Sequence, residues 1–304
     1  MTEDAFLQRL FTRMPAANDD VAVPPGDDCA ALRLGDDRLL LIAVDQVVGD
    51  KHYVRGGPQP TAPNAVGRKL LARNLSDIAA MGGIPRHCLI TVAVAPKPDQ
   101  DWHDRFFDGV FGLAEQFDMD VLGGDIAAAP VDDVATLTIL GDVPCAEVCL
   151  RSGAQAGDRL FATGTFGDSL GSGHHLSFTP RCAEGRWLAH GGWTRTMIDV
   201  SDGLLLDAAR VCRASGVGLT LRTHAIPRRS SDTTLDHALR DGEDYELLAA
   251  VPARRAGDLL RDWPFPETPL ACLGEFTDRA GVIVDENDRP LAADGGGYDH
   301  LANP

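Results

Sequence analysis

The sequence predicts an α/β protein with α+β character, built from two domains. Strand-sized and helix-sized apolar segments alternate in both halves of the chain, a pattern typical of mixed layers of sheet and helix. The 304 residues are long for one compact core and comfortable for two of ordinary size. The segment 144–157, which starts with proline and ends with glycine, lies between the halves. We therefore expect domains at 1–145 and 146–304.

Three helices are predicted in the first half. The segment Glu3–Met14 carries its apolar side chains at helical spacing on one face. A longer helix is expected over Pro63–Met81, because consecutive glycines at 82 and 83 end it. The third helix, Pro98–Phe117, is amphipathic, with an apolar face made of Trp102, Phe106, Val110 and Leu113.

Strands are predicted between these helices and through the second half. Cys29–Leu34 and Arg38–Val44 flank a Gly-Asp-Asp turn at 35–37. One further helix is expected over Gly203–Ser215 in the second half. The remaining apolar segments of strand length are Cys88–Ala95, Val121–Gly123, Val134–Val143, Arg159–Thr163, Thr196–Val200, Val217–Arg222, Tyr245–Val251, Leu270–Leu273 and Val282–Val284.

The charge balance limits the partners of the chain. With 28 basic and 45 acidic residues, the formal net charge is −17, which disfavours nucleic acid and anionic membranes as partners. A phosphate-rich ligand would need positive charge between itself and the protein, and metal ions are the obvious source. The sequence contains neither a membrane-length apolar run nor a signal-peptide pattern. Seven scattered cysteines predict reduced thiols and a cytoplasmic location.

Acidic residues occupy the ends of several predicted elements. They lie in a glycine-containing loop, at strand ends, in the last turns of a helix and just before a strand. Mg²⁺ prefers oxygen ligands and often bridges substrate phosphates, so carboxylates gathered at one rim could hold such ions. Turn formation or helix capping is the competing interpretation for each acid alone, as for Asp202 before the predicted helix at 203. The acids in question are Asp27, Asp28, Asp45, Asp77, Asp125, Asp199, Asp202, Glu243 and Asp244.

Common nucleotide and hydrolase motifs do not occur in the sequence. The glycine-rich segment 163–173 could cradle a phosphate, but it lacks the Gly-Lys-Ser/Thr ending of a P-loop. The sequence also lacks the Rossmann fingerprint, the protein-kinase signatures, the hydrolase nucleophile elbow and the HExxH zinc motif. His174 and His175 are adjacent, but no Cys or His partner stands at metal-binding spacing from them.

A series of short motifs resembles the thiamine-monophosphate kinase family of the aminoimidazole-ribonucleotide-synthetase-like superfamily. The resemblance spans nearly the whole chain, and NLSDIAAMGG and GEDYEL are its most specific segments. In chain order the motifs are GDDCA (26–30), VDQVVGDKH (44–52), NLSDIAAMGG (74–83), LGGD (122–125), RSGAQAGD (151–158), TGTFGDS (163–169), IDVSDGL (198–204), GEDYEL (242–247) and GYDH (297–300).

This resemblance implies a fold and an activity. It implies an N-terminal domain that forms a homodimer through its sheet, and a C-terminal α/β domain that completes a cleft. It also implies direct Mg²⁺-dependent transfer of the ATP γ-phosphate to thiamine monophosphate, which gives thiamine diphosphate and ADP. Such phosphoryl transfer depends mainly on positioning and charge neutralisation. The implied cofactors are several Mg²⁺ ions, with ATP as co-substrate.

The resemblance also implies a role for individual residues. Those expected to act in catalysis are Asp77, Asp125 and Asp202. Those expected to contact ATP are Gly124, Asp125, Arg151 and Ser201. Those expected to bind thiamine monophosphate are His52, Glu243 and Tyr298. The implied metal ligands are Asp28, Asp45, Asp77, Asp125, Asp199 and Asp202.

One departure from the family pattern keeps alternatives open. Ala43 and Val44 stand where members often carry Ser-Thr before Asp45, so two hydroxyls that can assist a metal are missing. This leaves the number of bound ions open. The alternatives are a non-catalytic nucleotide-binding homologue and a related ATP-dependent synthetase. Without the resemblance, His52 could be merely exposed, Tyr298 could close the core, and Arg151 could form a surface ion pair.

Overall fold

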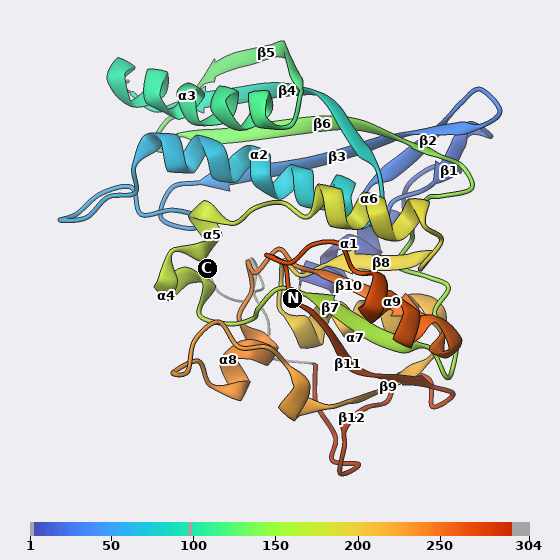
Figure 1. Cartoon of the computed structure of the whole chain (residues 1–304). Coiled ribbons are helices and arrows are strands. Elements are labelled where there is room, and N and C mark those ends of the chain that lie inside the picture. The colour runs from blue at the N-terminus through green and yellow to red at the C-terminus, as the bar shows by residue number, and fades with distance from the viewer. Residues whose placement is uncertain (1–2, 97–98, 294–304) are drawn as a thin grey trace.

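Two sheets with helices between them form the framework of the molecule (Figure 1). The computed structural model describes residues 3–96 and 99–293. The elements of the first half are α1 (Glu3–Phe11), β1 (Val21–Val23), β2 (Ala30–Leu34), β3 (Arg38–Val48), α2 (Pro63–Ala80), β4 (Ile84–Val94), α3 (Gln100–Gln116), β5 (Asp120–Ala128) and β6 (Val134–Pro144).

The second half contributes the other sheet and several short helices. Its strands are β7 (Arg159–Thr163), β8 (Thr196–Asp199), β9 (Gly218–Leu221), β10 (Leu247–Val251), β11 (Leu270–Thr277) and β12 (Ile283–Asp285). Its helices are α4 (Ser169–Ser172), α5 (His174–Ser177), α6 (Cys182–His190), α7 (Leu204–Ser215), η1 (Thr223–Ala225), α8 (Leu235–Arg240), η2 (Ala253–Arg255) and α9 (Ala256–Asp262). The mixed two-domain fold class predicted from the sequence is confirmed.

Within residues 3–96 and 99–293, helices cover only one face of the first sheet. Its strand order is β1-β2-β3-β6-β4-β5, and only the β4–β5 pair among these is parallel. Leu39, Leu41 and Ala43 alternate along β3 and are buried on the face toward α2. Val44 points to the opposite face and is 62% exposed. We call this uncovered side the open face of the first sheet.

Helix α2 is the central element of the fold. Proline at its first position and the paired glycines after it set its ends, as the sequence predicted. It packs on β3 and β6 of the first sheet and on α3, α6 and β8. A side chain at Gly67 would place its Cβ 1.9 Å from the Phe106 carbonyl oxygen, so glycine there allows α2 and α3 to cross closely. Acids on α2 are thereby fixed between the two halves.

The second sheet is buried on both faces. Its strand order is β12-β9-β11-β7-β10-β8. Leu247 and Ala249 of β10 join the core that contains α2 and α6, whereas Leu248 and Ala250 join the core beneath α7. This is why 245–251 is almost continuously apolar rather than alternating.

Two strands extend beyond their predicted ends. Asp45 was expected to end a strand, but β3 continues to Val48 because β6 pairs with it along its whole length. Likewise β5 runs through Asp125 to Ala128, paired with β4. At Gly124 a Cβ would lie 1.6 Å from the Ile90 carbonyl oxygen, so the glycine permits this pairing. Both acids therefore lie within strands.

Short elements of the second half were not predicted. Helices α6, α8 and α9 span only 6–9 residues each. Such lengths carry little periodicity, and tertiary packing supplies most of their stability. Among the described residues, none of the helices combines the length and the apolar character that crossing a bilayer requires.

Candidate active site

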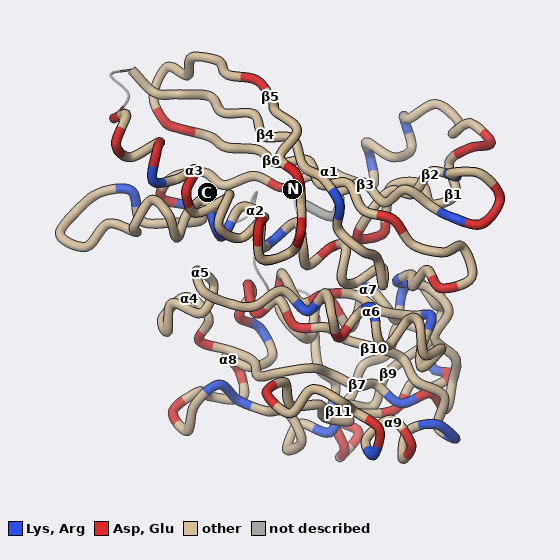
Figure 2. The backbone as a smooth tube through the Cα atoms, turned by 45° about the horizontal axis from the view of Figure 1, so that its top comes forward, with Lys and Arg blue, Asp and Glu red and all other residues tan. Residues whose placement is uncertain are grey.

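An acidic cluster brings together three of the predicted metal-binding aspartates. Ligand oxygens of Asp28, Asp77 and Asp199 all lie within 4.8 Å of one another. Asp28 precedes β2, Asp77 lies in the last turn of α2, and Asp199 ends β8. We call these three residues the acidic cluster. They come from both sheets and from the helix between them, and acidic residues of both halves lie where the halves meet (Figure 2).

Burial and mutual repulsion disfavour the charged form of the carboxylates in the acidic cluster. Burial first, and then the charges of Asp45, Asp199 and Asp28, raise the pKa of Asp77 well above its usual range. Burial also raises the pKa of Asp199, and the charge of Asp28 adds to this effect. Oδ2 of Asp28 is buried without a hydrogen-bond partner among the described residues. A divalent cation such as Mg²⁺ fits this donor set, because it would bind the orphan oxygen and cancel the repulsion.

Arg151 and Ser76 hold the acidic cluster in place. Nε and Nη2 of Arg151 donate to Oδ1 of Asp28, at 3.1 and 2.6 Å. The Ser76 hydroxyl donates to Oδ2 of Asp199 at 2.6 Å. Asp27 accepts the Arg151 amide, at 3.2 and 3.1 Å, and burial together with Asp28 raises its pKa to about 6. Arg151 is therefore partly buried at the cluster and is not an exposed surface ion pair.

Asp45 lies beside the acidic cluster and is paired with an arginine. Nη2 of Arg73 donates to Oδ1 of Asp45 at 3.1 Å, and Nη1 donates to the Gln46 carbonyl. Arg73 lies one helical turn before Asp77 on α2, so the two residues share a face. The negative charge of Asp45 is close enough to Asp77 to contribute to the raised pKa of Asp77.

Asp202 interacts with a neighbouring arginine and is not grouped with the acidic cluster. Nη1 of Arg210 lies 2.5 Å from Asp202 and 2.6 Å from Asp207. Helix α7 begins at Leu204 without a side-chain cap, so Asp202 does not act as its N-cap. Asp207 is fully buried and accepts the Asp202 amide, and burial raises its pKa to about 7. The Ser201 carbonyl accepts the Glu243 amide at 2.7 Å.

Asp125 lies apart from the acidic cluster within one chain. The pairing register places Asp45, Leu137, Ile90 and Gly124 in one row across β3, β6, β4 and β5. Three strand spacings separate β5 from β3, which is about 14 Å. Gly124 shares the face of Asp45, so the next residue, Asp125, points to the open face. The carboxylate of Asp125 is exposed there, at the edge of the sheet.

A second polar group joins two predicted substrate-binding residues through a buried lysine. Nζ of Lys69 contacts both carboxylate oxygens of Glu243, at 2.7 and 2.8 Å. The same ammonium donates to the His52 carbonyl at 2.8 Å and lies 2.9 Å from Nδ1 of His175. These contacts hold the pKa of Glu243 at about 2, with His175 and Lys69 outweighing its burial. We call these four residues the Lys69 network.

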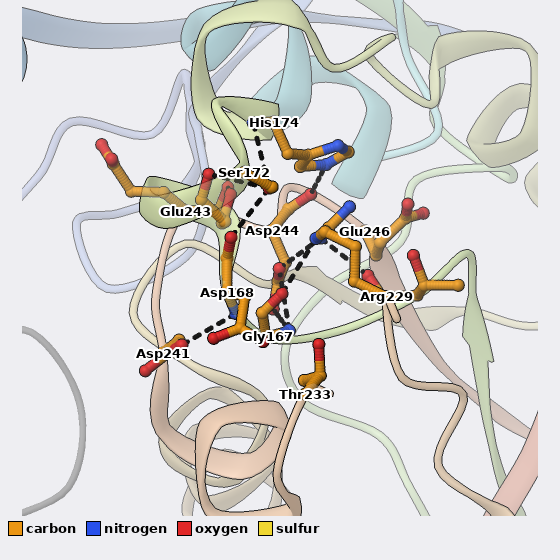
Figure 3. Close-up of polar contacts among 12 residues, drawn as sticks. Gly167, Asp168, Ser172, His174, Arg229, Thr233, Asp241, Glu243, Asp244 and Glu246 are labelled. Carbon is orange, nitrogen blue, oxygen red and sulfur yellow. Dashed lines mark hydrogen bonds and ion pairs between the residues drawn. The ribbon is translucent and has the colours of Figure 1, made fainter. Parts of the chain in front are cut away.

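Asp244 and Glu246, which follow Glu243, each have a cationic partner. Asp244 accepts the Gly167 amide and Nη2 of Arg229, the latter at 2.5 Å (Figure 3). Glu246 accepts Nε and Nη2 of Arg181, at 2.7 and 2.6 Å. Both acids are at most 1% exposed. We call Asp244 and Glu246 the paired acids, and their contacts fix the loop that carries Glu243.

The sequence interpretation included Arg151 but missed the other cations of the site. Lys69, Arg73 and Asp77 stand at i, i+4 and i+8 on α2, and this spacing places them in one stripe of an otherwise apolar helix. Charges on the buried stripe of a helix were the available signal for Lys69 and Arg73. Arg181 and Arg229 lie far along the chain from their partners' motif and gave no such signal. Tyr298, a predicted substrate contact, lies outside the described residues.

Comparison with known proteins identifies relatives over the whole chain. The model of the AIR synthase related protein family, N-terminal domain, matches residues 26–143. The thiamine-monophosphate kinase of Salmonella typhimurium is 32% identical, and the match covers 99% of each chain. The solved structure of thiamine-monophosphate kinase from Stenotrophomonas maltophilia is 28% identical, with a TM-score of 0.75 and coverage of 95% of this chain and 96% of that one.

A further structural relative supports the fold alone. The structure of AaThiL complexed with AMPPCP and TMP has a TM-score of 0.83 and 24% sequence identity. The match covers 98% of this chain and 97% of that chain. The arrangement of two mixed domains is thus shared over essentially the full length.

Proposed function

The chain belongs to the thiamine-monophosphate kinase family, and from that premise we propose that it transfers the γ-phosphoryl group of ATP directly to thiamine monophosphate. The products are thiamine diphosphate and ADP. The observation that carries this proposal is the acidic cluster, where Asp28, Asp77 and Asp199 converge and a buried carboxylate oxygen of Asp28 has no partner among the described residues. Such a set suits phosphoryl transfer, because that reaction needs charge cancelled more than it needs covalent chemistry.

The acidic cluster is the proposed Mg²⁺ site. Asp28, Asp77 and Asp199 would hold the ions, with Asp45 beside them and Asp202 at their edge. Mg²⁺ bound there would neutralise the phosphates of both substrates and the charge that develops during transfer. Arg151 adds a fixed positive charge next to Asp28, and we place the polyphosphate of ATP beside it and Ser201. The Ser76 hydroxyl, which donates to Asp199, would orient that carboxylate for metal binding.

The Lys69 network is the proposed acceptor side of the site. Glu243 remains ionised, as its pKa of about 2 indicates, and can attract the cationic thiazolium ring. Nδ1 of His52 accepts the Val48 amide at 3.0 Å, so a neutral His52 ring carries its proton on Nε2, and we keep His52 as a predicted contact of thiamine monophosphate. The acceptor oxygen belongs to a phosphate that is ionised at neutral pH, so the reaction needs no strong general base. Tyr298 remains a predicted aromatic contact.

We propose a homodimer through the open face of the first sheet. Val44, Thr138 and Leu89 stand side by side in register on that face. Val44 is 62% exposed and Leu89 is 38% exposed, which is unusual for apolar residues in the middle of a sheet. Asp125 lies on the same face, so we further propose that Gly124 and Asp125 serve the acidic cluster of a second copy. We also propose that the boundary between the two domains lies between residues 145 and 146.

A mixing experiment tests this exchange of residues. Asp77→Asn and Asp125→Asn proteins, each nearly inactive alone, should regain activity when unfolded together and refolded, because some dimers then contain one intact site. Sedimentation velocity should show a dimer, and Val44→Asp should shift it toward monomer. Mixed protein that is no more active than either variant alone would contradict the exchange.

The activity itself is tested directly. Purified protein is incubated with ATP, Mg²⁺ and thiamine monophosphate, and thiamine diphosphate is measured by chromatography. We expect product only when all three are present. Absence of product with ATP still bound would favour the non-catalytic homologue, for which the Ala43-Val44 departure is the supporting feature. ATP hydrolysis without thiamine diphosphate would favour a related ATP-dependent synthetase. The free state of all seven described cysteines fits the proposed cytoplasmic location.

Glu243→Gln tests which substrate lies at the Lys69 network. The change removes the negative charge and keeps the shape of the side chain. We expect the KM for thiamine monophosphate to rise about tenfold or more, since a charged hydrogen-bonded contact contributes roughly 1.5–3 kcal/mol. The KM for ATP should change little. The reverse pattern would mean that ATP, and not thiamine monophosphate, lies at the Lys69 network.

A further inference from the structure

We propose that Lys69 is a positioning residue that sets the affinity for the acceptor substrate. It does so by holding Glu243 and the His52 segment in one fixed arrangement. This inference rests on the proposed function, because it assigns the Lys69 network to thiamine monophosphate. It concerns a residue that the motifs of the sequence did not single out.

Burial decides how Lys69 can act. Its side chain has no exposed surface, so it cannot contact a substrate and can affect one only through the groups that it holds. Its ammonium donates to the Glu243 carboxylate and to the His52 carbonyl and lies 2.9 Å from Nδ1 of His175, so it contacts three segments of the chain. An ammonium with several such contacts fixes the relative positions of the groups around it.

The partners of Lys69 belong to both halves of the chain. His52 lies in the loop after β3, whereas Glu243 and His175 belong to the second half. Glu243 itself has a φ of 64°, in the left-handed region that non-glycine residues rarely adopt. The Ser201 carbonyl, the Ser169 hydroxyl and Lys69 together hold it there. The Glu243 carboxylate is therefore aimed by its contacts and not by backbone preference.

The cost of burying Lys69 argues against a role in stability alone. A buried ion pair often contributes no more to stability than apolar side chains of similar volume. Arg68, the preceding residue on α2, shows what purely structural contacts look like here. It donates only to the main-chain carbonyls of Leu176 and Phe178. Lys69 instead contacts the side chain proposed to bind the substrate.

Titration of Lys69 offers a readout that needs no variant. Burial lowers its pKa to about 8, although Glu243 and Asp45 oppose the shift and Arg73 adds to it. His175 is the other titratable group in contact with the ammonium. As pH rises through about 8, Lys69 loses its proton and its ion pair with Glu243. The Kd for thiamine monophosphate should then rise with pH, while the Kd for ATP should not.

The decisive experiment is a double-mutant cycle on substrate affinity. We expect Lys69→Met to raise the KM for thiamine monophosphate about tenfold and to change the KM for ATP less than about twofold. The Lys69→Met/Glu243→Gln protein should resemble Glu243→Gln, because Lys69 acts mainly through that carboxylate. Arg68→Met is the matched control, expected to lower the thermal stability and to leave both KM values unchanged.

The outcomes separate this inference from the proposed function. Wild-type protein that neither binds nor phosphorylates thiamine monophosphate would overturn both. Wild-type protein that does both, with equal effects of Lys69→Met on the two KM values or with multiplicative effects in the cycle, would overturn this inference alone. If Lys69→Met does not fold, the double variant still removes both buried charges. Its Kd for thiamine monophosphate should then match Glu243→Gln and lose the rise above about pH 8.

Discussion

The acidic cluster and the paired acids are two groups of buried carboxylates with opposite designs. In the acidic cluster, Asp28, Asp77 and Asp199 face one another, and the Arg151 contacts go to one oxygen of Asp28. In the paired acids, Asp244 and Glu246 each contact an arginine of their own. A buried acid that the chain pairs with a cation depends on that partner, whereas a buried acid that the chain leaves without one can bind a cation.

Because of this difference, the acidic cluster and the paired acids should respond differently to substitution. Removing a partner from a paired acid leaves a charge that burial makes costly. Removing one charge from the acidic cluster relieves repulsion that a bound cation or protonation would otherwise relieve. Substitutions that break the paired acids should therefore lower stability. Substitutions in the acidic cluster should lower activity and raise the stability of the metal-free protein.

The largest effect is expected for Arg181→Met among the paired acids. The change leaves Glu246 buried without its cation, and breaking such a pair typically costs about 3–5 kcal/mol. The free energy of unfolding should fall by that amount in a denaturant titration, whereas Mg²⁺ affinity should not change. A fall of less than about 1 kcal/mol would show that Glu246 does not depend on Arg181.

A large effect on catalysis is expected for Asp77→Asn in the acidic cluster. The substitution removes charge that holds Mg²⁺ at the transferring phosphoryl group, so turnover should fall more than about a hundredfold. Steady-state kinetics with saturating substrates measures the change. Asp104→Asn, at an exposed position on α3, serves as the control with unchanged turnover. Nearly unchanged turnover in Asp77→Asn would remove that residue from the metal site.

The pH dependence of stability should differ with and without Mg²⁺. Folding raises the pKa of Asp27 from 3.8 to about 6 and that of Asp207 to about 7, and it also raises the pKa values of Asp77 and Asp199. Between pH 3.8 and about 7 the folded protein keeps protons that the unfolded chain has released, so the stability of the metal-free protein falls as pH rises.

Thermal unfolding at pH values across that window checks this expectation. Mg²⁺ should suppress the part of the fall that comes from the acidic cluster. The part due to Asp244, whose pKa burial raises to about 7 against the contacts with Gly167 and Arg229, should remain. An equal slope with and without Mg²⁺ would indicate that no ion binds the acidic cluster.

The smallest expected effect is a gain in stability. Without Mg²⁺, Asp199→Asn should raise the melting temperature modestly, because it removes one of three mutually repelling charges while Ser76 can still donate to the amide oxygen. In the same assay, the melting temperature should therefore rise in Asp199→Asn and fall in Arg181→Met. A lower melting temperature in Asp199→Asn would mean that the acidic cluster contributes to folding as the paired acids do.

Local pattern was enough to predict much of the framework. The apolar face of α3, the proline and glycines that bound α2, and the Gly-Asp-Asp turn between β2 and β3 each act over a few residues, so the sequence alone showed them. The family resemblance indicated the activity and included Asp28, Asp77 and Asp199 among six implied metal ligands. The short helices α6, α8 and α9 were missed because they depend on packing more than on periodicity.

Tertiary structure decided which charged groups meet. Asp45 and Asp125 both follow apolar strand residues, yet one lies beside Asp77 and the other points to the open face three strands away. The sequence places Lys69 on the apolar stripe of a helix, but only the approach of Glu243 and His52 in the folded chain gives its ammonium its partners. Local conformation follows from neighbours along the chain, whereas pairing of charges depends on distances in space that the chain sets only when it folds.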